Sequence, residues 1–286
     1  MFSNLKKRIN KNIFYEHFKQ ILKNKYFSTK IKCNPFGNFI VGTKNDYLNL
    51  YHNSLKIRYP EIENFENLHN FKIDRLWLNE LALHTQVTIK ESDICFQHGV
   101  LLYTSLRKYL ANHKIKNTNQ KINILETGTA RGFSSLCMAK ALHDSCADGL
   151  IHTIDIIPHN KKFYWNIIDD LEGKKSRSQL LKPWNNLVNK YIKFYEGNSI
   201  QMINKLNINR INFCFLDASH TFFDVKKESQ KIIKLQDKND IIFFDDYSAN
   251  YDGVVKASNY VTNKYNYTNQ RIRANQSRGY MISIKN

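Results

Sequence analysis

The sequence predicts a doubly wound α/β fold built on a mostly parallel sheet. Four short apolar runs in the second half of the chain each stop on a carboxylate, namely residues 122–126, 151–155, 211–217 and 241–246. Strands that are buried on both faces show continuous β-branched and aromatic runs of this kind. Crossover connections in such a sheet bring the carboxyl ends of all its strands to one edge, where ligands bind.

Five acids stand at these four strand ends: Glu126, Asp155, Asp217, Asp245 and Asp246. A polar residue must follow any buried strand, so one terminal aspartate is as readily structural as functional. The recurrence needs another explanation, and the predicted sheet would gather all five acids around one crevice.

A glycine-containing turn, ETGTARG from Glu126 to Gly132, follows the first predicted strand, and residues 133–142 after it have helical spacing. Glycines at such a turn let backbone N–H groups approach a bound cofactor. The turn alone is a weak signal. However, Asp155 lies about 23 residues beyond Gly132, where an acid accepts hydrogen bonds from ribose hydroxyls. We therefore expect a nucleoside-containing ligand.

Glu126 favours a cationic ligand, because a carboxylate beside the turn would repel the phosphates of a dinucleotide. S-adenosylmethionine carries an ammonium, a sulfonium and a ribose but no phosphate. It suits both Glu126 and Asp155.

At this point the chain resembles class I S-adenosylmethionine-dependent methyltransferases, whose cofactor loop reads E/D-x-G-x-x-x-G. More narrowly, the motifs ETGTARGFSS, LDASHTFFDVKKE and IIFFDDYSANYDGV resemble the macrocin-type O-methyltransferases. These are relatives of catechol O-methyltransferase that act on sugars and other small hydroxylated metabolites. The resemblance covers roughly residues 95–286 and implies a Rossmann-like sheet of seven strands, mostly parallel, with an antiparallel last strand.

The resemblance also implies where the cofactor binds. It assigns the methionine ammonium to Glu126 and the ribose to Asp155. The other cofactor-binding residues that it implies are Gly128, Thr129, Ala130 and Gly132 along the methionine, and Asn198 and Ser199 near the adenine. Many family members have aspartate in place of Asn198.

A metal site is expected where the third and fourth strands end. Asp217 ends one strand and Asp245–Asp246 ends the next, so three carboxylates can lie within a few ångströms, where like charges raise one another's pKa unless a cation neutralises them. Such oxygen clusters suit Mg²⁺ or another divalent cation, and an equivalent trio holds the metal in the catechol-type relatives. Adjacent strand residues point to opposite faces, so one of the pair could instead support the other ligands. A DD pair can also simply start a turn.

His220, three residues after Asp217, occupies the position of the family's proposed general base. Imidazole has a suitable pKa for that role. With metal lowering the pKa of a substrate hydroxyl, Asp217 and His220 would be the catalytic residues of an in-line methyl transfer. The alternative is a loop histidine that caps the helix beginning at Thr221.

Two parts are expected along the chain: an N-terminal, mainly helical extension over residues 1–94 and the methyltransferase domain over 95–286. The spacing of apolar residues near 14–22 predicts a helix in the extension, which would serve as a lid or in oligomerisation. Within the domain the sequence predicts helices at 95–120, 134–143, 199–205, 223–235 and 254–263, and a closing hairpin at 265–273 and 279–284.

The connection over residues 157–191 is longer than a usual crossover. Apolar residues at Trp165, Ile168 and Leu171 favour a single helix packed on the sheet. Alternatively, its aromatic residues form a lid whose rings stack on the substrate.

The net charge of +18 and pI near 9.6 favour a different partner, RNA. Against this, the lysines are spread along the chain, and DASH after the third run of strand residues lacks the Asn/Asp-Pro-Pro-aromatic tetrad of enzymes that methylate base amino groups. The alternatives to an O-methyltransferase of small metabolites are thus an RNA methyltransferase and a non-catalytic cofactor-binding protein.

Five cysteines form no CxxC pair and leave one over, which favours reduced thiols in the cytoplasm. No apolar run approaches the roughly 18 residues of a membrane span. We expect a cytoplasmic enzyme that binds a small hydroxylated substrate and no nucleic acid, and that can form a homo-oligomer through its extension.

Overall fold

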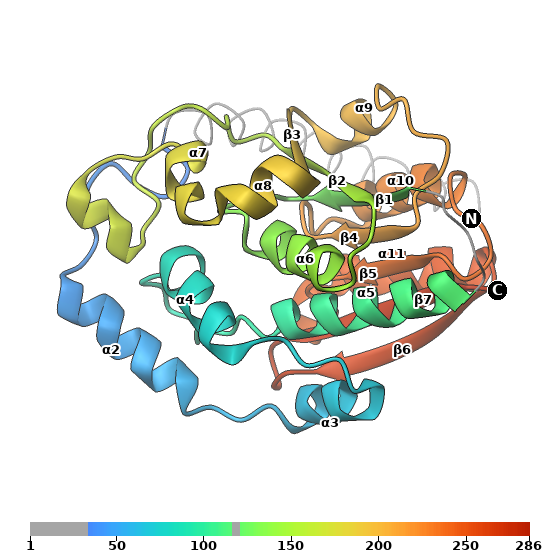
Figure 1. Ribbon diagram of the computed structural model, residues 1–286, viewed down its shortest axis with the longest axis horizontal. Helices are drawn as coiled ribbons and strands as arrows, with labels where there is room; N and C mark the ends of the chain where they lie inside the picture. The colour runs from blue at the N-terminus through green and yellow to red at the C-terminus, as the bar shows by residue number, and fades with distance from the viewer. Residues whose placement is uncertain (1–33, 116–120) are drawn as a thin grey trace, which may run out of the picture.

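The computed structural model describes residues 34–115 and 121–286, and it contains one seven-stranded sheet (Figure 1). The strands are β1 (Ile122–Thr127), β2 (Gly149–Asp155), β3 (Ile192–Glu196), β4 (Phe213–Leu216), β5 (Ile241–Phe244), β6 (Tyr267–Arg273) and β7 (Gly279–Lys285). Their order is β3-β2-β1-β4-β5-β7-β6, with parallel pairing from β3 through β5 and antiparallel pairing of β7 to both neighbours. The predicted fold, including its antiparallel last strand, is confirmed.

Helices cover both faces of this sheet. The face in front in Figure 1 carries α5 (His98–Ile115), α6 (Phe133–Asp144) and α8 (Asn185–Tyr191), and the other face carries α9 (Ser199–Ile203), α10 (Phe222–Ile233) and α11 (Asp252–Lys264). Each helix predicted within the second half of the chain is therefore present, with ends that differ by a few residues.

The core consists of two apolar layers that the central strands separate. Phe213, Phe215 and Phe243 belong to the cluster under α5 and α6, whereas Cys214 and Phe244 belong to the cluster under α10 and α11. Alternate residues of one strand thus face opposite layers, and all of them are buried. This explains why the strands read as uninterrupted apolar runs.

The N-terminal helices join the first of these layers. The helices are α2 (Lys44–Leu55), α3 (Pro60–His69) and α4 (Arg75–Thr85). Ile62, Phe65, Leu78 and Leu81 of α3 and α4 are buried in the same cluster as the side chains of α5 and α6. The boundary after residue 94 remains a prediction, and the helix predicted near residues 14–22 lies outside the described residues.

The long connection between β2 and β3 is not the single helix that its apolar spacing predicted. It forms η1 (Ile168–Glu172), α7 (Arg177–Leu180), η2 (Lys182–Trp184) and then α8. Asn166 and Gly173 have positive φ values of 54° and 100°, which interrupt a helix on either side of η1. The rings of Phe163 and Trp165 are fully buried in a small cluster of their own, so they do not form a stacking surface for a substrate.

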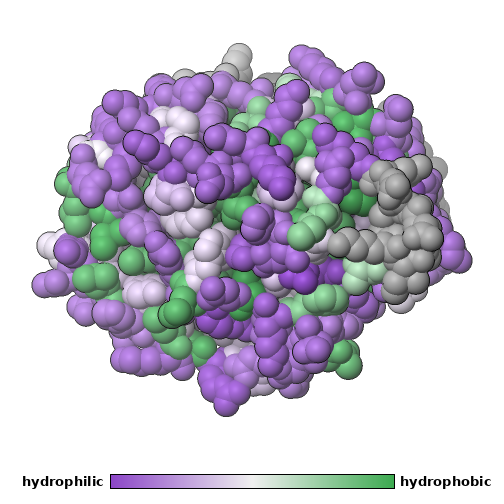
Figure 2. Space-filling view, viewed as in Figure 1, coloured by the Kyte–Doolittle hydropathy of each residue, from purple (hydrophilic) through white to green (hydrophobic). Residues whose placement is uncertain are grey.

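Hydrophilic side chains cover most of the face shown in Figure 2, with hydrophobic residues in small separate patches. Among residues 34–115 and 121–286, no helix is both long and apolar enough to cross a membrane.

Candidate active site

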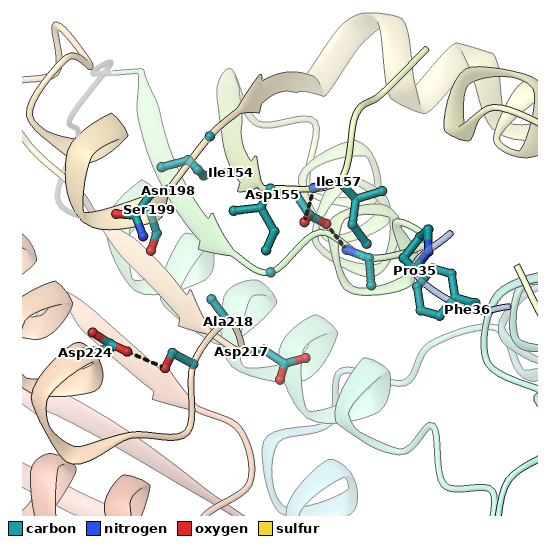
Figure 3. Close-up of a pocket in the computed structure, with 15 residues that line it drawn as sticks. Pro35, Phe36, Ile154, Asp155, Ile157, Asn198, Ser199, Asp217, Ala218 and Asp224 are labelled. Atoms are coloured by element: carbon teal, nitrogen blue, oxygen red, sulfur yellow. Dashed lines mark hydrogen bonds between the residues drawn. The ribbon is translucent and has the colours of Figure 1, made fainter. Parts of the chain in front are cut away.

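A cavity of about 550 Å³ opens at the carboxyl edge of the sheet (Figure 3). It is lined by residues that follow β1, β2, β3 and β4, together with a segment from the N-terminal part of the chain: Pro35, Phe36, Gly128, Ala130, Ile154, Asp155, Ile156, Ile157, Gly197, Asn198, Ser199, Asp217, Ala218, Ser219 and Asp224. The edge on which the sequence placed the acids is therefore the edge that holds the cavity.

The turn after β1 requires glycine where it meets the end of β4. Gly128 has a φ of 93°, and a Cβ at this position would lie 2.1 Å from the carbonyl oxygen of Asp217. Only glycine tolerates both the conformation and the approach. Gly132, with a φ of 88°, is the N-cap of α6. The cofactor turn and the first residue of the acidic group are thus packed directly against each other.

Asp155 lies in the wall of this cavity and is held by three donors. Its Oδ2 accepts hydrogen bonds from the Ala130 amide at 2.7 Å and from Arg177 Nη2 at 2.8 Å, and its Oδ1 accepts one from the Ile157 amide at 2.9 Å. Burial raises the pKa of the Asp155 carboxyl, while the Arg177 guanidinium opposes that rise. The carboxylate is fixed in one orientation at the rim of the turn.

Glu126 is fully buried, and its carboxylate accepts hydrogen bonds from the hydroxyls of Ser134, Ser135 and Thr153. Burial raises its pKa, and these hydroxyls oppose the rise. The side chain lies below the turn and is not part of the cavity wall. Its predicted contact with an ammonium group remains a prediction.

The turn after β3 forms the opposite wall from Pro35 and Phe36 in Figure 3. Asn198 is the N-cap of α9, where its side chain accepts from the Gln201 amide. The Ser199 hydroxyl donates to Glu228 of α10, whose pKa burial raises to about 7. Asn198 and Ser199 both line the cavity.

Of the eight predicted cofactor residues, five line the cavity: Gly128, Ala130, Asp155, Asn198 and Ser199. The three others support it from behind. Glu126 lies under the turn, the Thr129 hydroxyl contacts that of Thr153 at 2.5 Å, and Gly132 packs on Leu181.

At the other end of the cavity, Asp217, His220 and Asp246 form a group that could hold a metal ion. One side-chain ligand atom of each lies within 4.8 Å of those of the other two, and His220 Nε2 is 2.9 Å from Asp246 Oδ2. Asp246 has a φ of 52°, so the chain turns out of β5 there. A Cβ at Gly253, the second residue of α11, would lie 2.3 Å from the His220 carbonyl oxygen, so that close approach also depends on glycine.

Asp245 does not join this group, although the sequence placed it among the metal ligands. Its Oδ2 pairs with Arg278 Nη2 at 3.0 Å, and its Oδ1 accepts the Asp246 amide at 2.8 Å. Burial would raise the pKa of Asp245, but Arg278, His98 and the Asp246 amide together hold it below its usual value. The chain turns between the two aspartates, so one faces the cavity edge and the other faces Arg278.

The remaining group fits a divalent cation by its chemistry. Burial and the nearby carboxylates of Asp245 and Asp246 raise the pKa of Asp217 well above its usual value, and a bound cation would remove that repulsion. Two carboxylates suit Mg²⁺ or Mn²⁺, whereas an imidazole as third ligand suits later transition metals better. Sequence reasoning missed Arg177, Arg278, Pro35 and Phe36, because none belongs to a motif with the acids that it contacts or adjoins.

Comparison with known proteins places residues 125–247 under the family model of a methyltransferase domain. The search of curated proteins gave no match. Among solved structures, the chain is similar to an O-methyltransferase from Bacillus cereus in complex with SAH, at 14% identity and a TM-score of 0.51, over 83% of this chain and 96% of that one. It is also similar to the O-methyltransferase TomG from Streptomyces achromogenes, involved in tomaymycin synthesis and solved with SAM, at 17% identity and a TM-score of 0.50, over 78% and 94% of the two chains. At these identities the likeness establishes the fold.

Proposed function

Because residues 125–247 match the family model of a methyltransferase domain, we propose that the chain is a class I S-adenosylmethionine-dependent methyltransferase. We propose that it transfers a methyl group to a hydroxyl oxygen of a small metabolite, a sugar for example, with help from a divalent cation. One observation carries the proposal: a single cavity is lined by both Asp155 and Asp217. A ligand bound at Asp155 can therefore extend to the group of acidic residues that includes Asp217.

The cofactor would lie along the wall formed by the turns after β1, β2 and β3. Asp155 supports the ribose, and the backbone at Gly128 and Ala130 supports the methionine part. The adenine then adjoins Asn198 and Ser199. All five residues line the cavity, and in Figure 3 Asp155 lies between Asn198 and Ser199 on one side and Phe36 on the other, which supports the assignment.

Asp217 and Asp246 would hold the cation, whose charge lowers the pKa of the acceptor hydroxyl. Asp246 Oδ2, 2.9 Å from His220 Nε2, favours the imidazole tautomer with its proton on Nε2 and leaves Nδ1 free to accept a proton. His220 then takes the hydroxyl proton as the oxygen attacks the methyl carbon and the bond from that carbon to sulfur breaks. Asp245, paired with Arg278, supports the position of Asp246. Most of the rate would come from holding the two substrates in line.

We further propose that the enzyme works in the cytoplasm, because Cys95, Cys137, Cys146 and Cys214 are all free thiols. An oligomer formed through residues 1–94 remains a proposal. The net charge of +18 keeps RNA as a second candidate acceptor, and its signature would be an affinity that falls steeply with salt.

Calorimetric titration with S-adenosylhomocysteine, followed by a methyl-transfer assay on a panel of hydroxylated acceptors, tests the proposal. The assay is run with Mg²⁺, with Mn²⁺ and with a chelator, at low and high salt. We expect micromolar cofactor binding and metal-dependent transfer to a small hydroxylated acceptor. Absence of cofactor binding would refute the enzyme assignment, and transfer that persists in chelator would refute the role of the metal.

A further inference from the structure

We propose that Arg177, in the long connection between β2 and β3, is a positioning residue for cofactor binding. It holds the turn after β1 and the Asp155 carboxylate in one arrangement. The inference rests on the proposed function for its cofactor part. We call the contacts of Arg177 with the turn after β1 and with Asp155 the clamp. These contacts are present without any ligand.

Each nitrogen of the Arg177 guanidinium donates a hydrogen bond. Its Nε donates to the Ala130 carbonyl at 2.7 Å, its Nη2 to Asp155 Oδ2 at 2.8 Å and its Nη1 to the Ile157 carbonyl at 3.3 Å. The rings of Trp165 and Phe194 lie about it at 5.9 Å and 6.0 Å from the guanidinium carbon. The side chain is 2% exposed. One cation thus ties the turn after β1 to the end of β2.

The same contacts fix the orientation of the Asp155 carboxylate. Oδ2 accepts the Ala130 amide and Arg177, and Oδ1 accepts the Ile157 amide. Without the Arg177 guanidinium, backbone amides alone would hold the carboxylate in the cavity wall.

A second contact from the same connection supports the clamp. Arg131, the next residue of the cofactor turn, donates from Nε to the Trp165 carbonyl at 2.9 Å. Its guanidinium lies 4.2 Å from the centre of the Phe36 ring, which lines the cavity. Two consecutive residues of the turn, Ala130 and Arg131, are therefore bound to the connection. Folding of this connection fixes the geometry of the turn.

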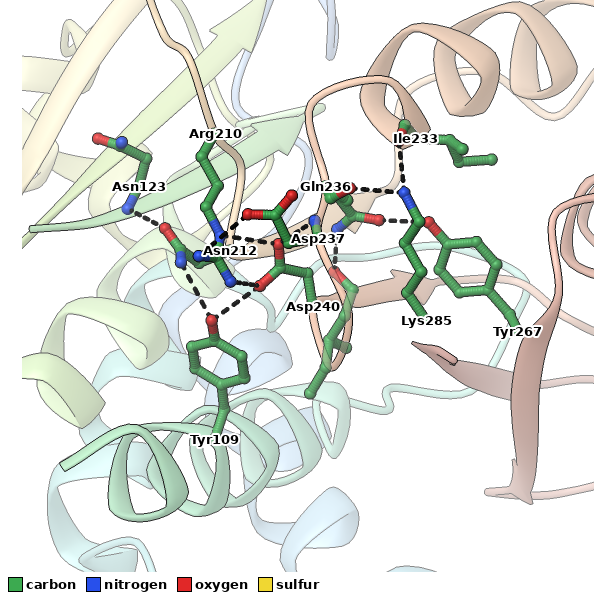
Figure 4. A network of polar contacts seen from close by, with 11 residues as sticks. Tyr109, Asn123, Arg210, Asn212, Ile233, Gln236, Asp237, Asp240, Tyr267 and Lys285 are labelled. Carbon is green, nitrogen blue, oxygen red and sulfur yellow. Dashed lines mark hydrogen bonds and ion pairs between the residues drawn. The ribbon is translucent and has the colours of Figure 1, made fainter. Parts of the chain in front are cut away.

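The opposite edge of the sheet offers a matched control. There Arg210 donates to both oxygens of the buried Asp240 at 2.9 Å and 3.0 Å, in a network with Tyr109 and Asn212 (Figure 4). It is again an arginine that pairs with a buried aspartate, but neither residue lines the cavity at the carboxyl edge. Loss of this pair should cost stability without affecting the cofactor.

The test compares Arg177→Lys, Arg177→Gln, Asp155→Asn and the double variant Asp155→Asn/Arg177→Gln with Arg210→Gln. We expect the dissociation constant for S-adenosylhomocysteine to rise at least 10-fold in Arg177→Gln and less in Arg177→Lys, and to stay within twofold in Arg210→Gln. The double variant should bind no more weakly than Asp155→Asn. Equal affinity of Arg177→Gln and Arg210→Gln, or losses that multiply in the double variant, would overturn the inference.

Hydrogen exchange without any ligand separates this inference from the proposed function. Amides of residues 128–132 should exchange faster in Arg177→Gln than in the parent and be unchanged in Arg210→Gln. If the parent binds no cofactor, the proposed function and the cofactor part of this inference fail together, while exchange still decides the clamp. Unchanged exchange in Arg177→Gln would refute the clamp even if the cofactor binds.

Discussion

The carboxylates at the two ends of the cavity differ in their charged neighbours. At the end formed by β1 and β2, Asp155 has an internal cation, because Arg177 reaches it from the connection that follows. At the end formed by β4 and β5, Asp217 and Asp246 have no arginine partner among the residues that the structure describes, and their neighbour His220 is 44% exposed. Asp217 is left with a raised pKa among like charges.

This difference separates two uses of a strand-terminal acid. A carboxylate paired with arginine is already neutralised, so it can orient a neutral ligand such as a ribose. A carboxylate that is crowded by other carboxylates and has no arginine partner needs a cation from outside. Asp245 shows that the pairing matters more than the place in the sheet, because Arg278 removes it from the metal group although it lies beside Asp246.

Asp217→Asn should produce the largest effect, and it should impair metal binding and turnover without affecting cofactor binding. We expect turnover to fall by about 1000-fold or more, because metal activation contributes several kcal/mol to the transition state. Affinity for S-adenosylhomocysteine should stay within about twofold. The metal-free variant should also be about 1 kcal/mol more stable than the parent, since a like charge is removed. Steady-state kinetics and urea unfolding in chelator measure both, and a loss of stability would contradict the comparison.

Asp155→Ala should destabilise the protein and weaken its binding of the cofactor. Removing one partner of a buried ion pair leaves Arg177 uncompensated, which costs about 3–5 kcal/mol of stability. The lost hydrogen bond to the ribose should weaken cofactor binding roughly 10- to 100-fold. Urea unfolding and calorimetry are the measurements. A variant as stable as the parent would show that the pair contributes nothing to the fold.

Glu228 tests a third way to bury a carboxyl, by keeping its proton. Its pKa is raised to about 7, so the folded protein binds more protons than the unfolded chain between pH 4.5, the ordinary pKa of a glutamate, and about pH 7. Stability should therefore fall as pH rises through this window, by roughly 3 kcal/mol in all. Glu228→Gln should remove that part of the pH dependence, as followed by thermal unfolding from pH 4.5 to 8. An unchanged slope would show that Glu228 is already ionised at pH 4.5.

Asp245→Asn should give the smallest effect and sharpen the distinction within the metal end. If Asp245 only supports Asp246, metal affinity should fall about 10- to 100-fold, as for other residues that orient metal ligands. Asp217→Asn should instead abolish metal binding. Titration with Mn²⁺ followed by electron paramagnetic resonance compares them, and equal losses would make Asp245 a direct ligand.

The sequence predicted the fold well because its signals are local. The four apolar runs became β1, β2, β4 and β5 with shifts of one or two residues at their ends. The connection after β2 was predicted less well, because the positive φ at Asn166 divides it and apolar spacing does not reveal that conformation.

The site could be predicted only as far as its motifs reach. Asp155 and Asp217 were found because each ends a strand, and both line the cavity. Their partners were not, because Arg177 lies 22 residues from Asp155, and Arg278 lies 33 residues from Asp245. One signal was available: arginine is much rarer than lysine in this chain, and arginine is the residue that suits buried ion pairs. Phe36 reaches the cavity from a distant part of the sequence and had no signal.

The central claim is that the two ends of the cavity are separate, one for the cofactor and one for a metal. The most direct test measures the affinity of the parent, Asp155→Ala and Asp217→Asn for both S-adenosylhomocysteine and Mn²⁺ by calorimetry. We predict that the first variant binds the cofactor roughly 10- to 100-fold more weakly and keeps its affinity for the metal. The second should keep its affinity for the cofactor and lose the metal. Loss of both ligands in either folded variant, or absence of Mn²⁺ binding to the parent, would contradict the account.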